Sequence, residues 1–279
     1  MYEAHFGLQE APFALTPNTR YFLRAPSHAD ALELLLVALQ EREGFIKITG
    51  EVGTGKTLLC RLLLNKLDGK ASTAYIPNPH LPPETLYEAV AEELGVDVTR
   101  CANTHQVLKA LNQRLIELAM AGQPVVLVID EAQAMPEATI EALRLLTNLE
   151  TESTKLLQVV LFGQPELDVV LGKESLRQLR QRITFQYQLS ALDRQSVSQY
   201  LRHRLAQAGY NGGELFAPGA LKLITRSSGG IPRLVNVLAH KAMLAAWGQG
   251  ARQVSRSHVL SAIRDTESAR QPGLLARWL

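Results

Sequence analysis

The sequence feature that most constrains the fold is a glycine-rich stretch between an apolar segment and a leucine-rich one. Residues 45–49 predict a short strand, residues 50–57 are Gly-Glu-Val-Gly-Thr-Gly-Lys-Thr, and residues 58–63 have the leucine spacing of a helix. A strand, the pattern Gly-x-x-x-x-Gly-Lys-Thr and a helix in this order are typical of a phosphate-binding P-loop. Its glycines accept backbone angles that turn successive N–H groups toward a phosphate chain. We therefore expect the chain to bind a nucleotide.

The side chains of this loop have separate expected roles. Lys56 supplies a positive charge for the β- and γ-phosphates, and the Thr57 hydroxyl is suited to coordinate Mg²⁺. The helix that begins near Lys56 adds the positive end of its dipole. The residues expected to contact ATP are Gly50, Glu51, Val52, Gly53, Thr54, Gly55, Lys56, Thr57 and Leu58.

A second informative stretch joins five apolar residues, 125–129, to the acidic pair Asp130 and Glu131. The apolar run predicts a strand buried on both faces of a parallel sheet. A carboxylate pair at the end of such a strand is costly to bury without a cation. Beside a P-loop, Asp130 is expected to help hold Mg²⁺ and Glu131 to polarise the attacking water. Without the P-loop, a helix-capping Asp would explain the pattern as well.

The next apolar run, residues 156–162, predicts a neighbouring strand that ends just before Gln164 and Pro165. Because the carboxyl ends of neighbouring parallel strands face one crevice, Gln164 is placed to contact the γ-phosphate or the water. Amides are also common in turns, so a turn role before Pro165 stays open.

A basic cluster precedes the last predicted strand, which alternates apolar and polar residues over 183–187. The cluster contains Arg177, Arg180 and Arg182. One interpretation is a solvated arginine face. The other is an arginine that neutralises transition-state charge on the nucleotide of a neighbouring subunit.

The alternation of strands and helices ends near residue 190, which indicates a domain boundary. Beyond it, the periodicity predicts helices over 193–208, 217–228, 232–247 and 255–266, with Arg233 at the start of the third. Arg233 is thus placed to reach a γ-phosphate across a cleft. We expect a nucleotide-binding αβα domain over residues 1–190 with an irregular, aromatic- and proline-rich N-terminal segment, a helical lid over 191–270, and a short tail over 271–279.

The bulk composition narrows the class of protein. With 46% hydrophobic residues and a net charge of +2 over 279 residues, the sequence is typical of a globular protein and gives no general argument for a polyanionic partner. No apolar run approaches the roughly 20 residues that span a bilayer. We therefore expect a cytoplasmic protein without a transmembrane segment.

Taken together, these motifs resemble those of AAA+ ATPases, and more closely those of the ExeA/GspA-type secretion ATPases. The residues that carry the resemblance are Phe6-Gly7-Leu8, Pro12-Phe13, Thr16-Pro17, residues 50–57, Asp130-Glu131-Ala132-Gln133, Gly163-Gln164-Pro165-Glu166-Leu167, residues 177–183 and Gly230-Ile231-Pro232-Arg233. The resemblance implies an α/β fold with a three-layer αβα core, a five-stranded parallel sheet in the order 5-1-4-3-2 and a C-terminal helical lid.

The resemblance also implies an activity and partners. It implies Mg²⁺-dependent ATP hydrolysis in a dimer or ring with nucleotide between subunits. In this scheme Gln164 and Arg233 sense the γ-phosphate and Arg182 acts in trans, with Arg180 as the alternative. The sequence ends at Leu279, whereas longer members continue into a transmembrane helix and a peptidoglycan-binding domain. The expected relatives are therefore the short members of MSHA (type IV) pilus biogenesis, which work beside inner-membrane assembly proteins, with peripheral membrane association.

A second hypothesis is a DNA-dependent regulator similar to the TniB/TnsC transposition ATPases. The residues that would line DNA are Arg202, His203, Arg204, Arg252, Arg256 and His258. The near-neutral charge and the lack of a recognisable reader motif argue against a nucleic-acid partner.

Overall fold

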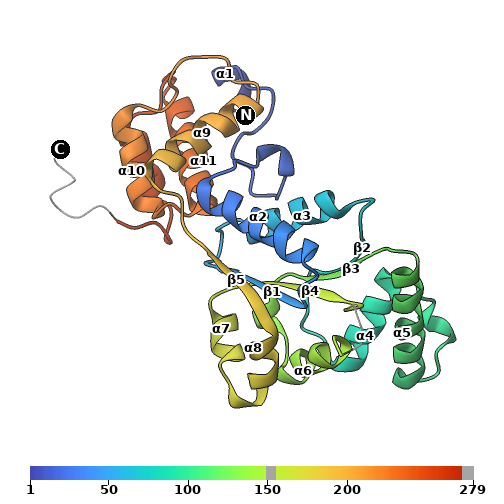
Figure 1. Cartoon of the computed structure of the whole chain (residues 1–279). Coiled ribbons are helices and arrows are strands. Elements are labelled where there is room, and N and C mark those ends of the chain that lie inside the picture. The colour runs from blue at the N-terminus through green and yellow to red at the C-terminus, as the bar shows by residue number, and fades with distance from the viewer. Residues whose placement is uncertain (149–154, 272–279) are drawn as a thin grey trace. The chain divides into compact units, whose positions relative to one another are not determined.

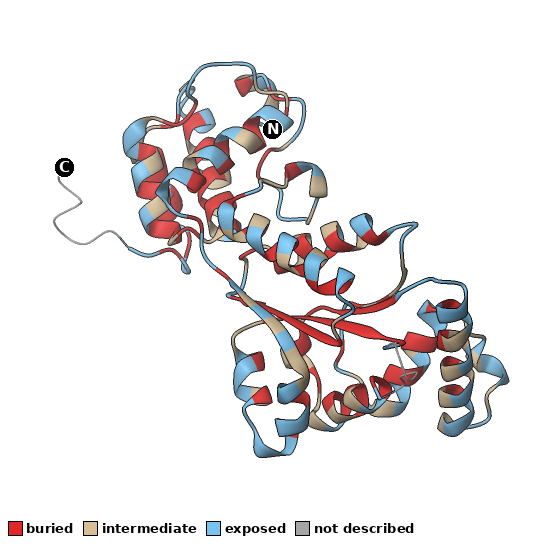
Figure 2. Cartoon of the chain, viewed as in Figure 1, coloured by how far each residue is buried: buried red, intermediate tan, exposed pale blue. Residues whose placement is uncertain are grey.

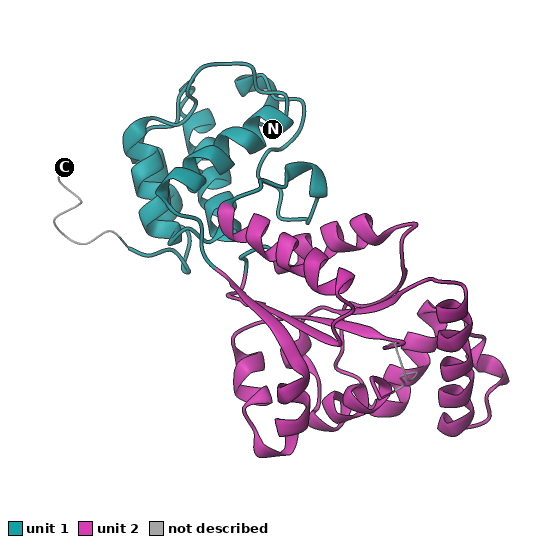
Figure 3. Cartoon of the chain, viewed as in Figure 1, with its two compact units in different colours: residues 1–25, 53–55, 190–279 teal, residues 26–52, 56–189 magenta. Residues whose placement is uncertain are grey.

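The computed structural model describes residues 1–148 and 155–271, which group into two compact units. Figure 3 shows them in different colours. The sheet unit comprises Pro26–Val52 and Lys56–Leu189, and the helical unit comprises Met1–Ala25, Gly53–Gly55 and the chain from Ser190 onward. The middle of the P-loop thus belongs to the helical unit, although both of its ends belong to the sheet unit.

The sheet unit is built on five parallel strands (Figure 1). They are β1 (Phe45–Gly50), β2 (Ser72–Ile76), β3 (Val125–Ile129), β4 (Gln158–Gly163) and β5 (Ile183–Leu189). Their order is β2-β3-β4-β1-β5, which confirms the order 5-1-4-3-2 that the resemblance implied. The strand that leads into the P-loop, β1, therefore lies between β4 and β5.

Helices cover both faces of this sheet, as an αβα core requires (Figure 1). One face packs against α2 (Pro26–Gln40) and α3 (Lys56–Leu67). The other packs against α4 (Pro83–Glu93), α5 (Thr104–Met120), α6 (Glu137–Leu146), α7 (Glu166–Leu171) and α8 (Arg177–Arg182). Successive strand residues point to opposite faces, so Ile46 joins the first apolar cluster and Phe45 the second.

The strands differ in burial as their position in the sheet requires. Every residue of β1, β3 and β4 is buried, whereas β5 alternates between half-buried and exposed side chains over most of its length (Figure 2). The half-buried Phe185 and Tyr187 pack against the cluster formed with α2 and α3, and Thr184 and Gln186 are exposed. The alternation seen in the sequence thus reflects an edge strand.

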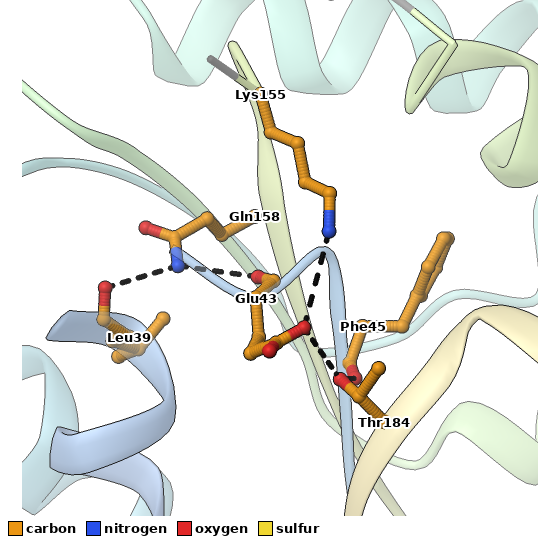
Figure 4. A network of polar contacts seen from close by, with 6 residues as sticks. All are labelled: Leu39, Glu43, Phe45, Lys155, Gln158 and Thr184. Atoms are coloured by element: carbon orange, nitrogen blue, oxygen red, sulfur yellow. Dashed lines mark hydrogen bonds and ion pairs between the residues drawn. The ribbon is translucent and has the colours of Figure 1, made fainter. Parts of the chain in front are cut away.

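A polar network ties together the starts of three strands (Figure 4). Gln158, the first residue of β4, is 3% exposed, and its Nε2 donates to the carbonyls of Leu39 at 3.1 Å and Glu43 at 3.2 Å. The Glu43 carboxylate accepts a hydrogen bond from the Thr184 hydroxyl at 2.8 Å and pairs with the Lys155 ammonium at 3.9 Å. These contacts join the chain entering β1 to β4 and β5.

The helical unit has an apolar core of its own. Its helices are α1 (Glu3–Phe6), α9 (Arg194–Gln207), α10 (Pro218–Ser228), α11 (Pro232–Gly248) and α12 (Arg256–Arg264). Residues 1–25 group with this unit, whereas we expected them in the nucleotide-binding domain. They also include a one-turn helix, α1, and a 3-10 helix, Thr19–Tyr21, in a segment expected to be irregular.

Arg204 of α9 explains where this N-terminal segment packs. Its guanidinium is buried and donates hydrogen bonds to the carbonyls of Pro12 and Ala14 and to the Tyr200 hydroxyl. It also lies 4.5 Å from the centre of the Tyr21 ring, at a distance that favours a cation–π interaction. One charged side chain thereby binds residues 12–21 to the helical unit.

Candidate nucleotide-binding site

The P-loop connects the carboxyl end of β1 to α3. Gly50 is the last residue of β1, Glu51–Gly55 form the turn, and α3 begins at Lys56. Gly53 and Gly55 have φ angles of 81° and 101°, in the region that favours glycine. The backbone therefore makes the turn that a phosphate cradle needs, at the N-terminal end of a helix of 12 residues.

Gly53 also allows a close approach within the helical unit. Its carbonyl accepts a hydrogen bond from the backbone N–H of Arg233, the second residue of α11, at 3.1 Å. A Cβ atom on Gly53 would lie 2.6 Å from the Cβ of Arg233. Arg233 is exposed. The structure thus places Arg233, a predicted γ-phosphate sensor, beside a glycine of the P-loop.

Lys56 and Thr57 meet the acidic pair. The Lys56 ammonium donates to the carbonyls of Gly50 at 2.7 Å and Glu51 at 3.1 Å. Burial lowers the pKa of Lys56, and the negative charges of Glu131 and Asp130 oppose this shift. The Thr57 hydroxyl forms a hydrogen bond with the Asp130 carboxylate. Two segments far apart in sequence therefore converge at one edge of the sheet.

Asp130 is 3% exposed and follows β3 directly. Burial raises its pKa, although the Thr57 hydroxyl and the Glu131 N–H, 2.9 Å from Oδ1, favour the charged form. The hydrogen bonds to Asp130 thus do not fully offset the cost of burying its negative charge, and a bound cation would offset the rest. A hydroxyl and a carboxylate are hard oxygen ligands, so Thr57 and Asp130 fit Mg²⁺.

Glu131 has a strained backbone and a well-fixed carboxylate. Its φ of 51° lies in the left-handed region, which is uncommon for a residue with a side chain and recurs at functional sites. Its Oε2 accepts hydrogen bonds from Nε2 of Gln133 at 2.6 Å and from Nε2 of Gln164 at 3.0 Å. Burial raises the pKa of Glu131, but these two bonds and the charge of Lys56 outweigh it and hold the pKa below its ordinary value.

The structure also shows a residue to which we assigned no role from the sequence. Gln133 lies in a short 3-10 helix, Ala132–Ala134, and its Oε1 accepts a hydrogen bond from the backbone N–H of Gln164 at 2.9 Å. Gln164 directly follows β4, and its side chain contacts Glu131 after β3, because the carboxyl ends of these neighbouring strands lie at the same edge of the sheet. The sequence signal for Gln133 was its place in the motif Asp130-Glu131-Ala132-Gln133, but its partner at Gln164 could not be read from spacing.

The candidate trans-acting arginines lie on α8. The Nη1 atom of Arg182 donates to the Thr147 hydroxyl at 3.1 Å, and that of Arg180 donates to the carbonyl of Gly172 at 3.1 Å. Arg182 is half-buried and Arg180 is exposed. The structure therefore places both at the α8–β5 edge of the sheet unit and leaves the choice between them open.

Several residues proposed to line DNA have other roles. Arg204 is buried against the N-terminal segment, and His258 is 4% exposed and caps α12 with Ser255. Arg202 pairs with Glu214 at 2.8 Å. The hypothesis of a DNA-contacting basic face therefore loses Arg204 and His258, because burial removes them from any such surface.

Comparison with known proteins agrees with this geometry. Residues 39–171 match the family model of an AAA domain. The chain is 42% identical over 281 aligned residues to the general secretion pathway protein A of Aeromonas hydrophila. The match covers 99% of this chain and 51% of that protein, so the chain spans about half the length of its relative. Within the described ranges, no helix combines the length and apolar character needed to cross a membrane.

Solved structures share the fold at low sequence identity. The ORC2 protein of Aeropyrum pernix, in its ADPNP–ADP complexes, has a TM-score of 0.68 at 18% identity, over 97% of this chain and 75% of that one. Cdc6p of Pyrobaculum aerophilum has a TM-score of 0.70 at 18% identity, over 91% of this chain and 70% of that one. The RuvB branch migration motor of Thermotoga maritima has a TM-score of 0.57 at 17% identity, over 85% of this chain and 68% of that one. These similarities support the fold alone.

Proposed function

We propose that the chain is a Mg²⁺-dependent ATPase of the AAA family; the AAA-domain match over residues 39–171 and the 42% identity to general secretion pathway protein A of Aeromonas hydrophila support this proposal. The observation that carries this proposal is the convergence of the P-loop and the acidic pair, joined by the hydrogen bond between Thr57 and Asp130. The negative charges of Glu131 and Asp130 favour the charged form of Lys56 against the effect of its burial on the pKa. A phosphate-binding lysine, a hydroxyl and two carboxylates are the groups that phosphoryl transfer to water requires.

The binding step follows from the contacts of the loop. Lys56 exchanges its hydrogen bonds to the carbonyls of Gly50 and Glu51 for phosphate oxygens. The N–H groups of the glycine-rich turn and the start of α3 bind the same phosphates. Thr57 and Asp130 would hold Mg²⁺, which when bound neutralises charge on the β- and γ-phosphates.

The chemical step requires a base that stays ionised and donors for the γ-phosphate. Glu131 accepts a proton from the attacking water, since its hydrogen bonds favour the charged carboxylate. Gln164 and Arg233 contact the γ-phosphate, and Arg182 of a second copy of the chain neutralises charge in the transition state. Gln164 already lies 3.0 Å from Glu131, which supports its role beside the water.

Two substitutions test this site in the whole chain. Lys56→Ala is expected to abolish binding of a fluorescent ATP analogue, whereas Glu131→Gln is expected to retain binding and lower hydrolysis by about 100-fold or more. Lys66→Ala, at an exposed lysine of the same helix, is the matched control and should change neither measurement. Parental hydrolysis by Glu131→Gln would refute the role of Glu131, and a parental chain that ignores Mg²⁺ and ATP would end the proposal.

The trans-acting arginine has its own test. Arg182→Ala is expected to lose hydrolysis while it keeps ATP binding, and mixing it with Lys56→Ala should partly restore activity, because each chain supplies what the other lacks. Arg180→Ala is the control and should keep parental activity. If no mixing ratio or concentration restores hydrolysis, the arginine does not act between subunits; if only Arg180→Ala behaves this way, Arg180 takes the role.

The proposed partner is a secretion or MSHA-like type IV pilus assembly at the inner membrane. The support is the 42% identity to a protein of a general secretion pathway. In this proposal the chain forms a dimer or ring on the cytoplasmic side, bound peripherally, and its nucleotide state controls the assembly. The test is to purify Glu131→Gln, stalled with ATP, from gently solubilised membranes and to identify the proteins that accompany it but not Lys56→Ala. If DNA-binding proteins accompany it instead, and DNA stimulates its hydrolysis of ATP, the alternative hypothesis of a DNA-dependent regulator is favoured.

A further inference from the structure

Gln133 forms a bridge between the two strand ends that carry the proposed chemistry. Its Oε1 accepts the backbone N–H of Gln164 at 2.9 Å, and its Nε2 donates to Oε2 of Glu131 at 2.6 Å. A backbone N–H can only donate and an ionised carboxylate can only accept, so this assignment of the amide is the one that satisfies both neighbours. A side chain with a donor and an acceptor is therefore required at this position.

The space around the bridge fits an amide in this place. A Cβ atom on Gly163, the last residue of β4, would lie 3.3 Å from Oε1 of Gln133 and 2.7 Å from Cδ2 of Leu167. A larger residue at position 163 would push against both. The glycine of the Gly163-Gln164 pair thus lets the Gln133 side chain reach β4.

We propose that Gln133 is a positioning residue that fixes the Glu131 carboxylate for activation of water and links it to Gln164. This inference rests on the proposed ATPase function and adds a residue to its site. The amides of Gln133 and Gln164 both donate to Oε2, so together they set the rotation of the carboxylate and engage Oε2 rather than Oε1. When Gln164 turns to the γ-phosphate, Gln133 keeps its donor on Glu131. The base therefore stays oriented while the sensor changes partners.

The experiment replaces Gln133 by Met, which keeps the length of the side chain and removes both hydrogen-bonding groups. Gln113→Met is the matched control, because Nε2 of Gln113 also donates to a glutamate, Glu117, at 3.2 Å on the exposed side of α5. For Gln133→Met we expect kcat for ATP hydrolysis to fall by about 10- to 100-fold, whereas ATP affinity should stay within about twofold of the parent. Gln113→Met should match the parent in both.

A second measurement separates this inference from the proposed function. Hydrogen exchange of the Gln164 backbone amide is followed by NMR in the nucleotide-free chain, because this N–H donates to Oε1 of Gln133. Faster exchange in Gln133→Met than in the parent and in Gln113→Met supports the bridge, whether or not the parent hydrolyses ATP. Unchanged exchange, an unchanged kcat, or a loss of ATP affinity equal to the loss of kcat would each overturn the positioning role.

Discussion

Substitution of Gly53 by Ala tests the close contact between the P-loop and the start of α11. The left-handed backbone at Gly53, with φ of 81°, costs alanine about 1–2 kcal/mol. The added Cβ would lie 2.6 Å from the Cβ of Arg233 and 3.2 Å from Cγ2 of Ile231. Ordinary carbon contacts are about 3.5–4.0 Å, so the first turn of α11 must retreat by about 1 Å. Such overpacking costs about 1–3 kcal/mol, which gives a total of about 2–5 kcal/mol.

The assay is urea unfolding of the nucleotide-free chain, followed by circular dichroism. Gly250→Ala is the matched control in the same unit, because Gly250 has φ of 68° and an added Cβ there would meet nothing within 4 Å. It should lose only the backbone contribution of about 1–2 kcal/mol. If Gly53→Ala is no less stable than Gly250→Ala, the packing of Arg233 against the P-loop does not exist in solution and the reasoning fails.

Three further substitutions test other contacts by the same unfolding assay. Asp130→Asn should stabilise the nucleotide-free chain at neutral pH, because burial raises the pKa of Asp130 and makes its charged form unfavourable. The free energy of unfolding of the parent should therefore fall as the pH rises above 3.8, the ordinary pKa of this carboxyl group, and the variant should lack that fall. Gln158→Met should cost about 1–3 kcal/mol by removing the buried amide that donates to the carbonyls of Leu39 and Glu43, against less than about 0.5 kcal/mol for Gln113→Met. Arg204→Met should cost about 2–3 kcal/mol and speed proteolysis of the N-terminal segment; equal cleavage rates in variant and parent would contradict that anchoring role.

Much of the sheet unit could be predicted from local patterns. The apolar run at 125–129 became β3, and the alternation at 183–187 became an edge strand, because burial on two faces or one leaves a different residue pattern. The order of the strands did not follow from these patterns and came from the resemblance. The six-residue helices α7 and α8 were missed, since so short a segment shows too little of the helical period.

Contacts between distant parts of the chain could not be predicted. The aromatic and proline residues before residue 26 indicated packing on a surface, but nothing in them told which unit supplies that surface. The decisive residue, Arg204, carries a charge, and charged residues are usually exposed to solvent; its hydrogen bonds to two carbonyls and a tyrosine hydroxyl show why it is buried. Likewise, Lys56 and Asp130 could be proposed for the site from their motifs, whereas the proposal for Gln133 required its distance to Gln164.

The acidic pair shows how one strand end can support two tasks. Asp130 and Glu131 are adjacent in sequence, yet burial raises the pKa of Asp130, while two amide donors and Lys56 lower the pKa of Glu131 against its burial. Two carboxylates pushed in opposite directions indicate different roles. Asp130 gains most from a cation, which suits a ligand of Mg²⁺. The two amide donors and Lys56 already stabilise Glu131 as an anion, so its carboxylate needs no metal to stay charged. The same residue has the left-handed backbone and accepts the hydrogen bonds from Gln133 and Gln164.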